Sequence, residues 1–219
     1  MNKISDDILC RVEKPIRYTG GELNSFSKDK NKVDIRVAFC FPDVYEVGMS
    51  HLGTKILYYT MNQREDTFCE RAFAPWPDME EQMRKNNIPM YTLETKDSLK
   101  VFDLVAFTLQ YEMSYTNILN MLSMANIPIR AEDRTEDDPI VFCGGPCAYN
   151  PEPLYAVADF FALGEGEVQL DEVLDLYKEC KDKGLSKKEF LRKAVAIRGI
   201  YVPSLYDVTY NEDGTIKEF

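Results

Sequence analysis

The chain has 219 residues, of which 45% are hydrophobic and 29% charged, and its net charge at pH 7 is −11. This composition is typical of a globular protein. The excess of acidic over basic residues argues against direct nucleic-acid binding, which usually relies on a basic patch or stripe. No apolar run approaches the roughly 18 residues of a membrane-spanning helix, and the polar start of the chain lacks the apolar core of a secretory signal. We therefore expect a cytoplasmic protein that does not enter a membrane.

Residues 1–32 predict an irregular N-terminal arm. Pro15 and the paired Gly20 and Gly21 interrupt any regular pattern, and the charged run at residues 28–32 is typical of a solvated connection.

Short apolar strands and amphipathic helices then alternate between residues 33 and 183. The strands are rich in β-branched and aromatic residues, and the helices carry apolar residues at helical spacing. We expect strands at 34–41, 67–73, 90–93, 103–109, 139–143 and 159–163, and helices at 53–62, 76–86, 114–125, 153–157 and 167–181, with the weakest strand patterns at 67–73 and 90–93.

This alternation predicts parallel βαβ units with right-handed crossovers and helices on both faces of one sheet. The predicted fold class is α/β, with a Rossmann-like (flavodoxin-like) doubly wound parallel sheet in the strand order 2-1-3-4-5.

Residues 184–219 follow a different pattern and predict a small helix and β-hairpin extension. A helix is expected at 186–196 and strands at 199–202 and 206–210, followed by a hairpin turn at 211–214. Because the sequence stops soon after the partner strand begins, we expect the chain to be a fragment that leads into a further domain.

The six cysteines are scattered, and several lie inside apolar runs, as reduced and buried thiols do. Cys143 and Cys147 form the one close pair, and neither a second pair nor a nearby histidine completes a zinc site. We favour small buried residues at the end of a strand over a metal site, and we predict no metal here.

Four loops would meet at the carboxyl edge of the sheet, where open α/β sheets bind ligands. Their glycines let a ligand approach the backbone, and helix N-termini supply oriented N–H groups. The candidate cofactor-binding residues in these loops are Pro42, Asp43, Tyr45, Gly48, Met49, Ser50, His51, Leu52, Thr108, Gln110, Tyr111, Glu112, Gly144, Gly145, Pro146, Gly164, Glu165, Gly166 and Glu167.

Motifs in these loops resemble the cobalamin-binding-type domain that precedes many radical S-adenosylmethionine (SAM) enzymes. A Leu-Gly step at 52–53 opens the first main helix, Gly-Gly-Pro stands at 144–146, and Asp159 precedes Gly-Glu-Gly-Glu at 164–167. Their order and spacing fit over residues 34–182, and together they are more specific than any one alone. The arm and the run from Asp43 also resemble a subgroup of radical SAM proteins of unassigned substrate.

The resemblance implies cobalamin as a small-molecule cofactor and a C-terminal radical SAM domain as the partner of this one. That domain would hold a [4Fe–4S] cluster and SAM. The triad Cys-x-x-x-Cys-x-x-Cys is missing here, because Cys143 and Cys147 have its first spacing but Asn150 stands in the third place. We therefore expect the cluster and SAM only downstream, and no catalysis by this chain alone.

A second departure concerns His51. Classical cobalamin domains carry Asp-x-His-x-x-Gly after the first strand, whereas here Asp43 and His51 lie too far apart and His51 is followed by Leu-Gly. If cobalamin binds, we expect that His51 does not replace its lower ligand, and we favour a polar residue near a helix start.

Two groups in the loops have alternative interpretations. Glu165 and Glu167 could transfer protons, but a charge pair favoured by a helix N-terminus is the simpler interpretation. Tyr111, Glu112 and Met113 either line the face of a flat cofactor or form an exposed loop.

Three functions therefore compete. The first is the N-terminal cofactor- or substrate-binding domain of a radical SAM iron–sulfur enzyme. The second is the same fold without a cofactor, acting as a non-catalytic lid, substrate platform or partner surface. The third, a nucleotide or flavin binder, is weakest because no G-x-G-x-x-G follows the first strand.

Overall fold

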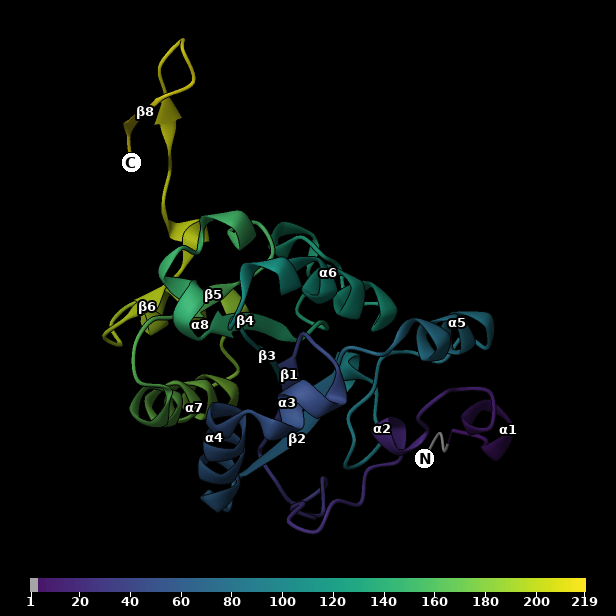
Figure 1. The fold of residues 1–219 in the computed structure, drawn as a ribbon. Helices are drawn as coiled ribbons and strands as arrows, with labels where there is room; N and C mark the ends of the chain where they lie inside the picture. The colour runs from purple at the N-terminus through teal and green to yellow at the C-terminus, as the bar shows by residue number, and fades with distance from the viewer. Residues whose placement is uncertain (1–3) are drawn as a thin grey trace.

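A six-stranded sheet forms the centre of the computed structural model, which describes residues 4–219 (Figure 1). The strand order is β2-β1-β3-β4-β5-β6; β1 to β5 are parallel, and β6 runs antiparallel to β5. The predicted doubly wound order is confirmed, with one strand added at the edge. The bounds are β1 Ile35–Phe41, β2 Thr67–Phe73, β3 Leu104–Thr108, β4 Ile140–Gly144, β5 Phe160–Ala162 and β6 Ile200–Tyr201.

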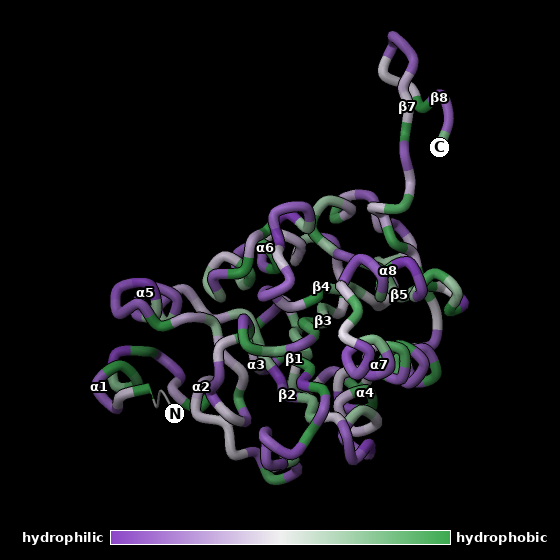
Figure 2. The backbone as a smooth tube through the Cα atoms, turned by 180° about the vertical axis from the view of Figure 1, so that it is seen from behind, coloured by the Kyte–Doolittle hydropathy of each residue, from purple (hydrophilic) through white to green (hydrophobic). Residues whose placement is uncertain are grey.

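Helices cover both faces of the sheet, so its central strands are buried on both sides, as in other parallel sheets. One face packs against α4, α7 and α8, and the other against α5 and α6. Figure 2 accordingly shows β3 and β4 as apolar segments in the interior of the protein. The bounds are α1 Asp6–Leu9, α2 Ile16–Thr19, α3 Tyr45–Ser50, α4 Leu52–Gln63, α5 Pro77–Lys85, α6 Tyr115–Met124, α7 Gly166–Asp182 and α8 Lys187–Ala194.

Short 3₁₀ turns occupy several of the connections. They are η1 Leu99–Val101, η2 Glu112–Ser114, η3 Ala131–Asp133, η4 Pro146–Tyr149, η5 Glu152–Leu154 and η6 Pro203–Leu205. The short helix predicted at 153–157 is η5, and the loop predicted between 41 and 53 contains helix α3.

The strand predicted at 90–93 is wrong. Tyr91 forms only an isolated bridge with Ser98. The Leu93 N–H does donate to the Arg71 carbonyl of β2, at 2.7 Å. Pairing of this segment with β2 stops there, because the Glu94 carboxylate accepts the hydrogen bond from the Arg71 N–H, at 2.7 Å, in place of a backbone carbonyl.

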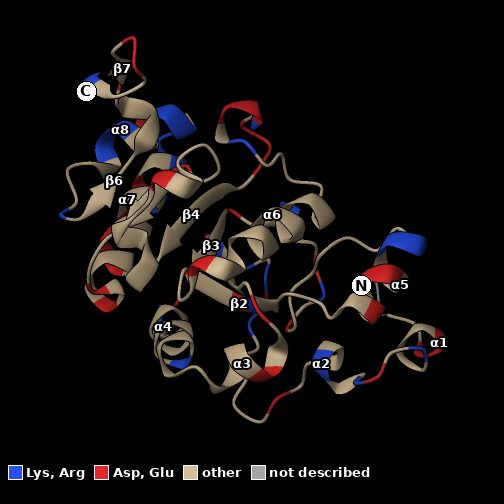
Figure 3. Ribbon diagram, turned by 45° about the horizontal axis from the view of Figure 1, so that its top comes forward, with Lys and Arg blue, Asp and Glu red and all other residues tan. Residues whose placement is uncertain are grey.

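Basic residues gather on α8, as Figure 3 shows. A capping box between Ser186 and Glu189 starts this helix, and Phe190 is its buried anchor. Lys193 pairs with Glu179 of α7, so part of the basic face is neutralised locally. None of the helices among residues 4–219 is long and apolar enough to cross a membrane.

The predicted C-terminal hairpin is confirmed. Strands β7 Thr209–Tyr210 and β8 Ile216–Glu218 pair antiparallel and project from the body of the protein (Figure 1). Every residue from 204 to 219 is exposed.

Asp66 stands immediately before β2 and ties it to α7. Its carboxylate accepts hydrogen bonds from Arg64 at 3.0 Å, Thr67 at 2.9 Å and Lys178 at 3.2 Å. Partial burial acts to raise the pKa of Asp66, but these hydrogen bonds outweigh it and lower the pKa to about 2.

We expect the free energy of unfolding to fall as the pH drops from about 4 to about 2, in part because of Asp66. Its folded-state pKa lies below the unfolded value of about 3.9, so the folded state binds fewer protons, and the stabilisation present above pH 4 is lost on acidification. Urea midpoints measured across this range should fall less steeply for Asp66→Asn than for the parent. Asp7→Asn, an exposed control, should keep the parent slope. Equal slopes for all three proteins would contradict this assignment.

Candidate functional site

A cavity of about 120 Å³ opens at the carboxyl ends of β1, β3, β4 and β5, between the sheet and helices α4 and α7. Its apolar lining comes from the strands and from one side of each helix. These residues are Phe39, Ala106, Phe107, Phe142, Ala162, Leu57 and Leu170.

Seven of the predicted candidates line this carboxyl-edge cavity. They supply its polar groups and most of its glycines, and Gly53 of α4 completes the lining. The seven are His51, Thr108, Gln110, Gly144, Gly145, Gly164 and Gly166.

Close contacts surround two of these glycines. Gly145 has φ +101°, and a Cβ there would lie 2.9 Å from the Leu109 carbonyl oxygen. The loops after β3 and β4 are also joined by hydrogen bonds from the Leu109 N–H to the Gly144 carbonyl at 2.6 Å and from the Cys147 N–H to the Leu109 carbonyl at 3.0 Å. At the start of α7, a Cβ on Gly166 would lie 3.2 Å from Leu57 of α4. The glycines therefore let the walls of the cavity approach one another.

His51 is the N-cap of α4. Its Nδ1 accepts the Thr54 N–H at 3.1 Å and lies 3.0 Å from the Thr54 hydroxyl, while its ring packs against Phe41 at 5.3 Å between centroids. Because Nδ1 is an acceptor, the neutral ring carries its proton on Nε2, which then has no lone pair for a metal. The capping contact thus fixes a tautomer that does not fit a lower ligand to cobalt.

Three other candidates after β1 lie where α3 packs on β2. Tyr45 and Met49 pack on a small cluster that includes Phe73. Gly48 is buried, and a Cβ there would lie 2.3 Å from the Phe73 ring, so this glycine lets α3 lie flat on β2.

Three further candidates of that loop have different surroundings. The Pro42 carbonyl accepts from Asn117 of α6 at 2.9 Å, and the Asp43 carboxylate accepts the Val44 N–H at 2.7 Å. The Ser50 hydroxyl donates to the Glu46 carbonyl. None of these three side chains lines the cavity.

Exposed apolar side chains surround the same edge of the sheet and form what we call the rim. They belong to α4, α7 and the loops after β3 and β4. The rim residues are Leu52, Tyr111, Met113, Tyr149 and Val168, each more than half exposed.

The remaining candidates near the rim are solvent-facing. Glu165 is the N-cap of α7 without a side-chain capping bond, and Glu167 lies in its first turn, where the helix dipole favours an acid. Glu112 and Pro146 are exposed on η2 and η4. Burial and the neighbouring Glu112 raise the pKa of the Cys147 thiol.

The cysteines do not form a metal site. Among residues 4–219 no three His, Cys, Asp or Glu side chains are grouped to hold a metal ion. Cys143 is fully buried, and desolvation raises the pKa of its thiol well above the usual range, which disfavours the thiolate that a metal needs. The described residues therefore do not fit a [4Fe–4S] cluster.

The apolar lining was not among the candidates predicted from the sequence. Phe39, Ala106, Phe142 and Ala162 all face the α4/α7 side of the sheet. Two-residue alternation along each strand could have grouped them, since successive side chains point to opposite faces.

Comparisons with known proteins assign the chain to a family. Residues 53–203 match the family model described as the N-terminal part of radical SAM proteins, a range that holds three of the four loops. An uncharacterized protein of Methanocaldococcus jannaschii is 26% identical over 141 residues, which are 63% of this chain and 25% of that protein. The chain thus spans about a quarter of the length of this curated relative. No solved structure matches the chain.

Proposed function

The chain belongs to the family of N-terminal domains of radical SAM proteins, and we propose that it is the cofactor-binding domain of a radical SAM iron–sulfur enzyme. We propose cobalamin as the cofactor, held at the carboxyl-edge cavity without a histidine ligand. The observation that carries this proposal is the cavity itself, at the edge where open α/β sheets bind cofactors.

The residues at this edge fit a large, flat, partly apolar molecule. The cavity would take an apolar portion, and Gly144, Gly145 and Gly164 would let the rest approach the backbone. The rim would cover the cofactor's outer surface and exclude water from it. Bound cobalamin supplies radical and group-transfer chemistry at cobalt, whereas these residues bind and orient it.

Polar contacts would come from the loop after β3. The Thr108 hydroxyl accepts from the Gln110 amide at 2.7 Å, so the amide oxygen of Gln110 is left to accept a hydrogen bond from the ligand. His51 would hold the start of α4 in place through Thr54 and make no bond to cobalt.

The cluster and SAM belong, in this proposal, to a radical SAM domain later in the same chain. The relative's greater length leaves room for such a domain. All six cysteines are free, and four are buried, which fits the reducing cytoplasm that we propose as the location.

One observation favours a second function. The cavity is smaller than the 300–1,000 Å³ or so that is usual for small-molecule sites. The domain could therefore serve without a cofactor, as a non-catalytic lid, substrate platform or partner surface for the enzyme.

Titration of the full-length protein with hydroxocobalamin and methylcobalamin, by absorbance and calorimetry, tests the proposal. We expect one equivalent to bind with a shifted spectrum. Gly144→Val should weaken binding at least tenfold, because its side chain would fill part of the cavity, while its new Cβ would have only an ordinary 3.4 Å contact with the Ala162 carbonyl. His51→Ala should still bind with the same shifted spectrum, because His51 makes no bond to cobalt in this proposal.

The matched control is Val195→Ala, which follows α8 on the surface and does not line the cavity. Saturable binding that Gly144→Val leaves unchanged would move the site away from the cavity. A full-length protein that carries the cluster but binds no cobalamin at high micromolar concentration would establish the cofactor-free alternative.

A further inference from the structure

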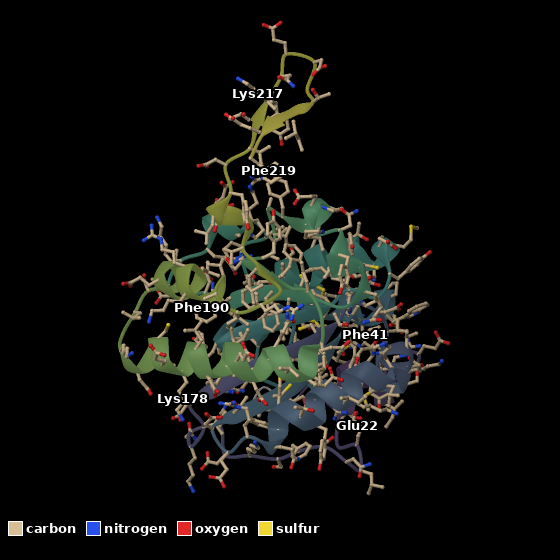
Figure 4. The ribbon with its side chains drawn as sticks, turned by 90° about the vertical axis from the view of Figure 1, so that its left-hand side faces the viewer. Glu22, Phe41, Lys178, Phe190, Lys217 and Phe219 are labelled. Atoms are coloured by element: carbon tan, nitrogen blue, oxygen red, sulfur yellow. The ribbon has the colours of Figure 1, made fainter. Side chains whose placement is uncertain are left out.

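The C-terminal segment 203–219 leaves the body of the protein with its apolar side chains uncovered. Pro203 is buried, but all sixteen residues after it are exposed. In Figure 4 the hairpin, marked by Lys217, stands clear of the body in which Phe190 lies. A two-stranded hairpin alone in water is at best marginally stable, so this segment is expected to pack on something.

Among the contacts of residues 4–219, the segment is anchored only at its start. The Tyr206 ring lies 5.3 Å from that of Tyr201 on β6, and Tyr201 in turn stacks on Phe161 of β5 at 6.0 Å. The Tyr201 hydroxyl donates to Glu152 at 3.0 Å, which fixes this ring against η5. The outgoing chain is therefore held at one point, at the edge of the sheet.

Beyond that anchor, the chain and the body enclose a gap of about 490 Å³. One wall is the outgoing chain, and the other is formed by η3, η5, the start of β5 and β6. Tyrosines stand on both walls, among them Tyr155 on the body and Tyr206 and Tyr210 on the chain. Tyrosine is enriched at protein interfaces, where its ring is buried and its hydroxyl finds a partner.

Apolar exposure continues past the gap along the hairpin. Val208 and Tyr210 are 41% and 62% exposed, and Ile216 and Phe219 are 59% and 85% exposed. A small molecule in the gap would leave the last two uncovered. A partner of protein size could cover all four at once.

We propose that this gap and the hairpin, together called the hairpin face, are the docking surface of the radical SAM domain that follows in the same chain. The inference rests on the proposed function, which supplies that domain. The matched stretch is one quarter of the relative, so the partner is of sufficient size. A tethered domain also acts at an effective concentration in the millimolar range, which favours it over a second copy for the same surface.

Hydrogen–deuterium exchange on the full-length protein tests the hairpin face. Amides of residues 207–219 should exchange at least a hundredfold more slowly than those of residues 29–32, which are exposed in the same structure. The double variant Tyr206→Ser/Val208→Ser should restore fast exchange. Val101→Ser, at another exposed apolar position that does not line this face, should leave the protection intact.

Fast exchange of residues 207–219 in the parent would overturn the proposal. Protection that disappears on dilution, with a mass by light scattering of two chains, would assign the face to a second copy instead. Protection that requires added cobalamin would assign it to the cofactor. Iron analysis of the same preparation separates the two hypotheses. If the protein carries its cluster but the hairpin is unprotected, only the docking proposal fails. If the protein cannot be loaded with a cluster, the proposed function fails.

Discussion

Replacing Arg134 with methionine is expected to lower the free energy of unfolding by about 3–5 kcal/mol, because it leaves a largely buried carboxylate without its counter-charge. The Arg134 side chain is 3% exposed and lies 3.2 Å from the Asp159 carboxylate. Its guanidinium also donates to the Pro128 and Val157 carbonyls, and these acceptors would lose their partner.

The loss of stability caused by Arg134→Met should be smaller at acidic pH. Burial raises the pKa of Asp159, and Arg134 is the main group that opposes this rise. Without Arg134 the carboxyl protonates more readily in the folded state, so the variant is most destabilised at neutral pH and recovers as the pH falls. Urea unfolding at about pH 7 and pH 5 measures this difference.

Two variants sharpen the comparison. Adding Asp159→Asn to Arg134→Met should recover part of the loss, because the uncompensated charge is removed. Arg130→Met breaks an exposed pair with Glu132 and should change stability by no more than about 0.5 kcal/mol. A loss below about 1 kcal/mol for Arg134→Met at pH 7 would show that this pair does not hold the fold together.

The pair also explains a motif. Asp159 belongs to the pattern that resembles cobalamin-binding-type domains, but it lies at the start of β5, at the opposite end of that strand from the carboxyl-edge cavity. Its carboxylate accepts the Val141 N–H at 2.7 Å and so fastens β5 to β4. We infer a structural role for this residue of the motif, and a ligand-facing role for the glycines that follow the strand.

The sheet could be predicted from the sequence because its signals are local. β1 and β3 are short apolar runs that end where the chain turns toward a helix, and their parallel pairing follows from the alternation with helices. Helix α3 could not be predicted, since Gly48 lowers helix propensity. It forms against Phe73, a residue brought there by β2, and this contact is invisible in sequence order.

The position of the candidate site in the fold could be predicted from the sequence, but the residues that form its apolar lining could not. Glycine-rich turns after β4 and β5 mark the carboxyl edge, and Gly144, Gly145 and Gly164 do line the cavity. The apolar lining was missed because alternation shows that Phe39 and Cys40 face opposite sides of the sheet but does not show which helices cover each side. That choice depends on the crossovers of the whole chain.

Gly199→Ala is expected to be among the most damaging single-methyl additions in the chain. Gly199 has φ +86°, and a Cβ there would lie 2.2 Å from both the Leu163 carbonyl oxygen and the Gln169 amide nitrogen. These atoms form the joint between β5, β6 and α7, in which the Gln169 amide donates to the Leu163 carbonyl at 2.8 Å and to the Arg198 carbonyl at 2.7 Å. Strain and overpacking together predict a loss of about 2–5 kcal/mol.

Gly184→Ala is the matched control. Gly184 also has positive φ, at +62°, but a Cβ there would meet nothing within 4 Å. Gly184→Ala should be destabilised only by backbone strain, by about 1 kcal/mol. The difference in free energy of unfolding between the two variants therefore measures the cost of the close contact at the joint. Urea unfolding of both proteins gives that difference, and equal losses would show that the joint relaxes freely around the added methyl group.

The joint also connects the fold to the candidate site. Leu163 lies between Ala162 and Gly164, which both line the carboxyl-edge cavity, and its N–H donates to the Gly199 carbonyl at 2.8 Å. A methyl group on residue 199 must push on that stretch of chain. Where both variants are still folded, the proposed binding of cobalamin should therefore be severalfold weaker in Gly199→Ala, while Gly184→Ala keeps the affinity of the parent. Unchanged affinity in folded Gly199→Ala would mean that the end of β5 does not shape the binding site.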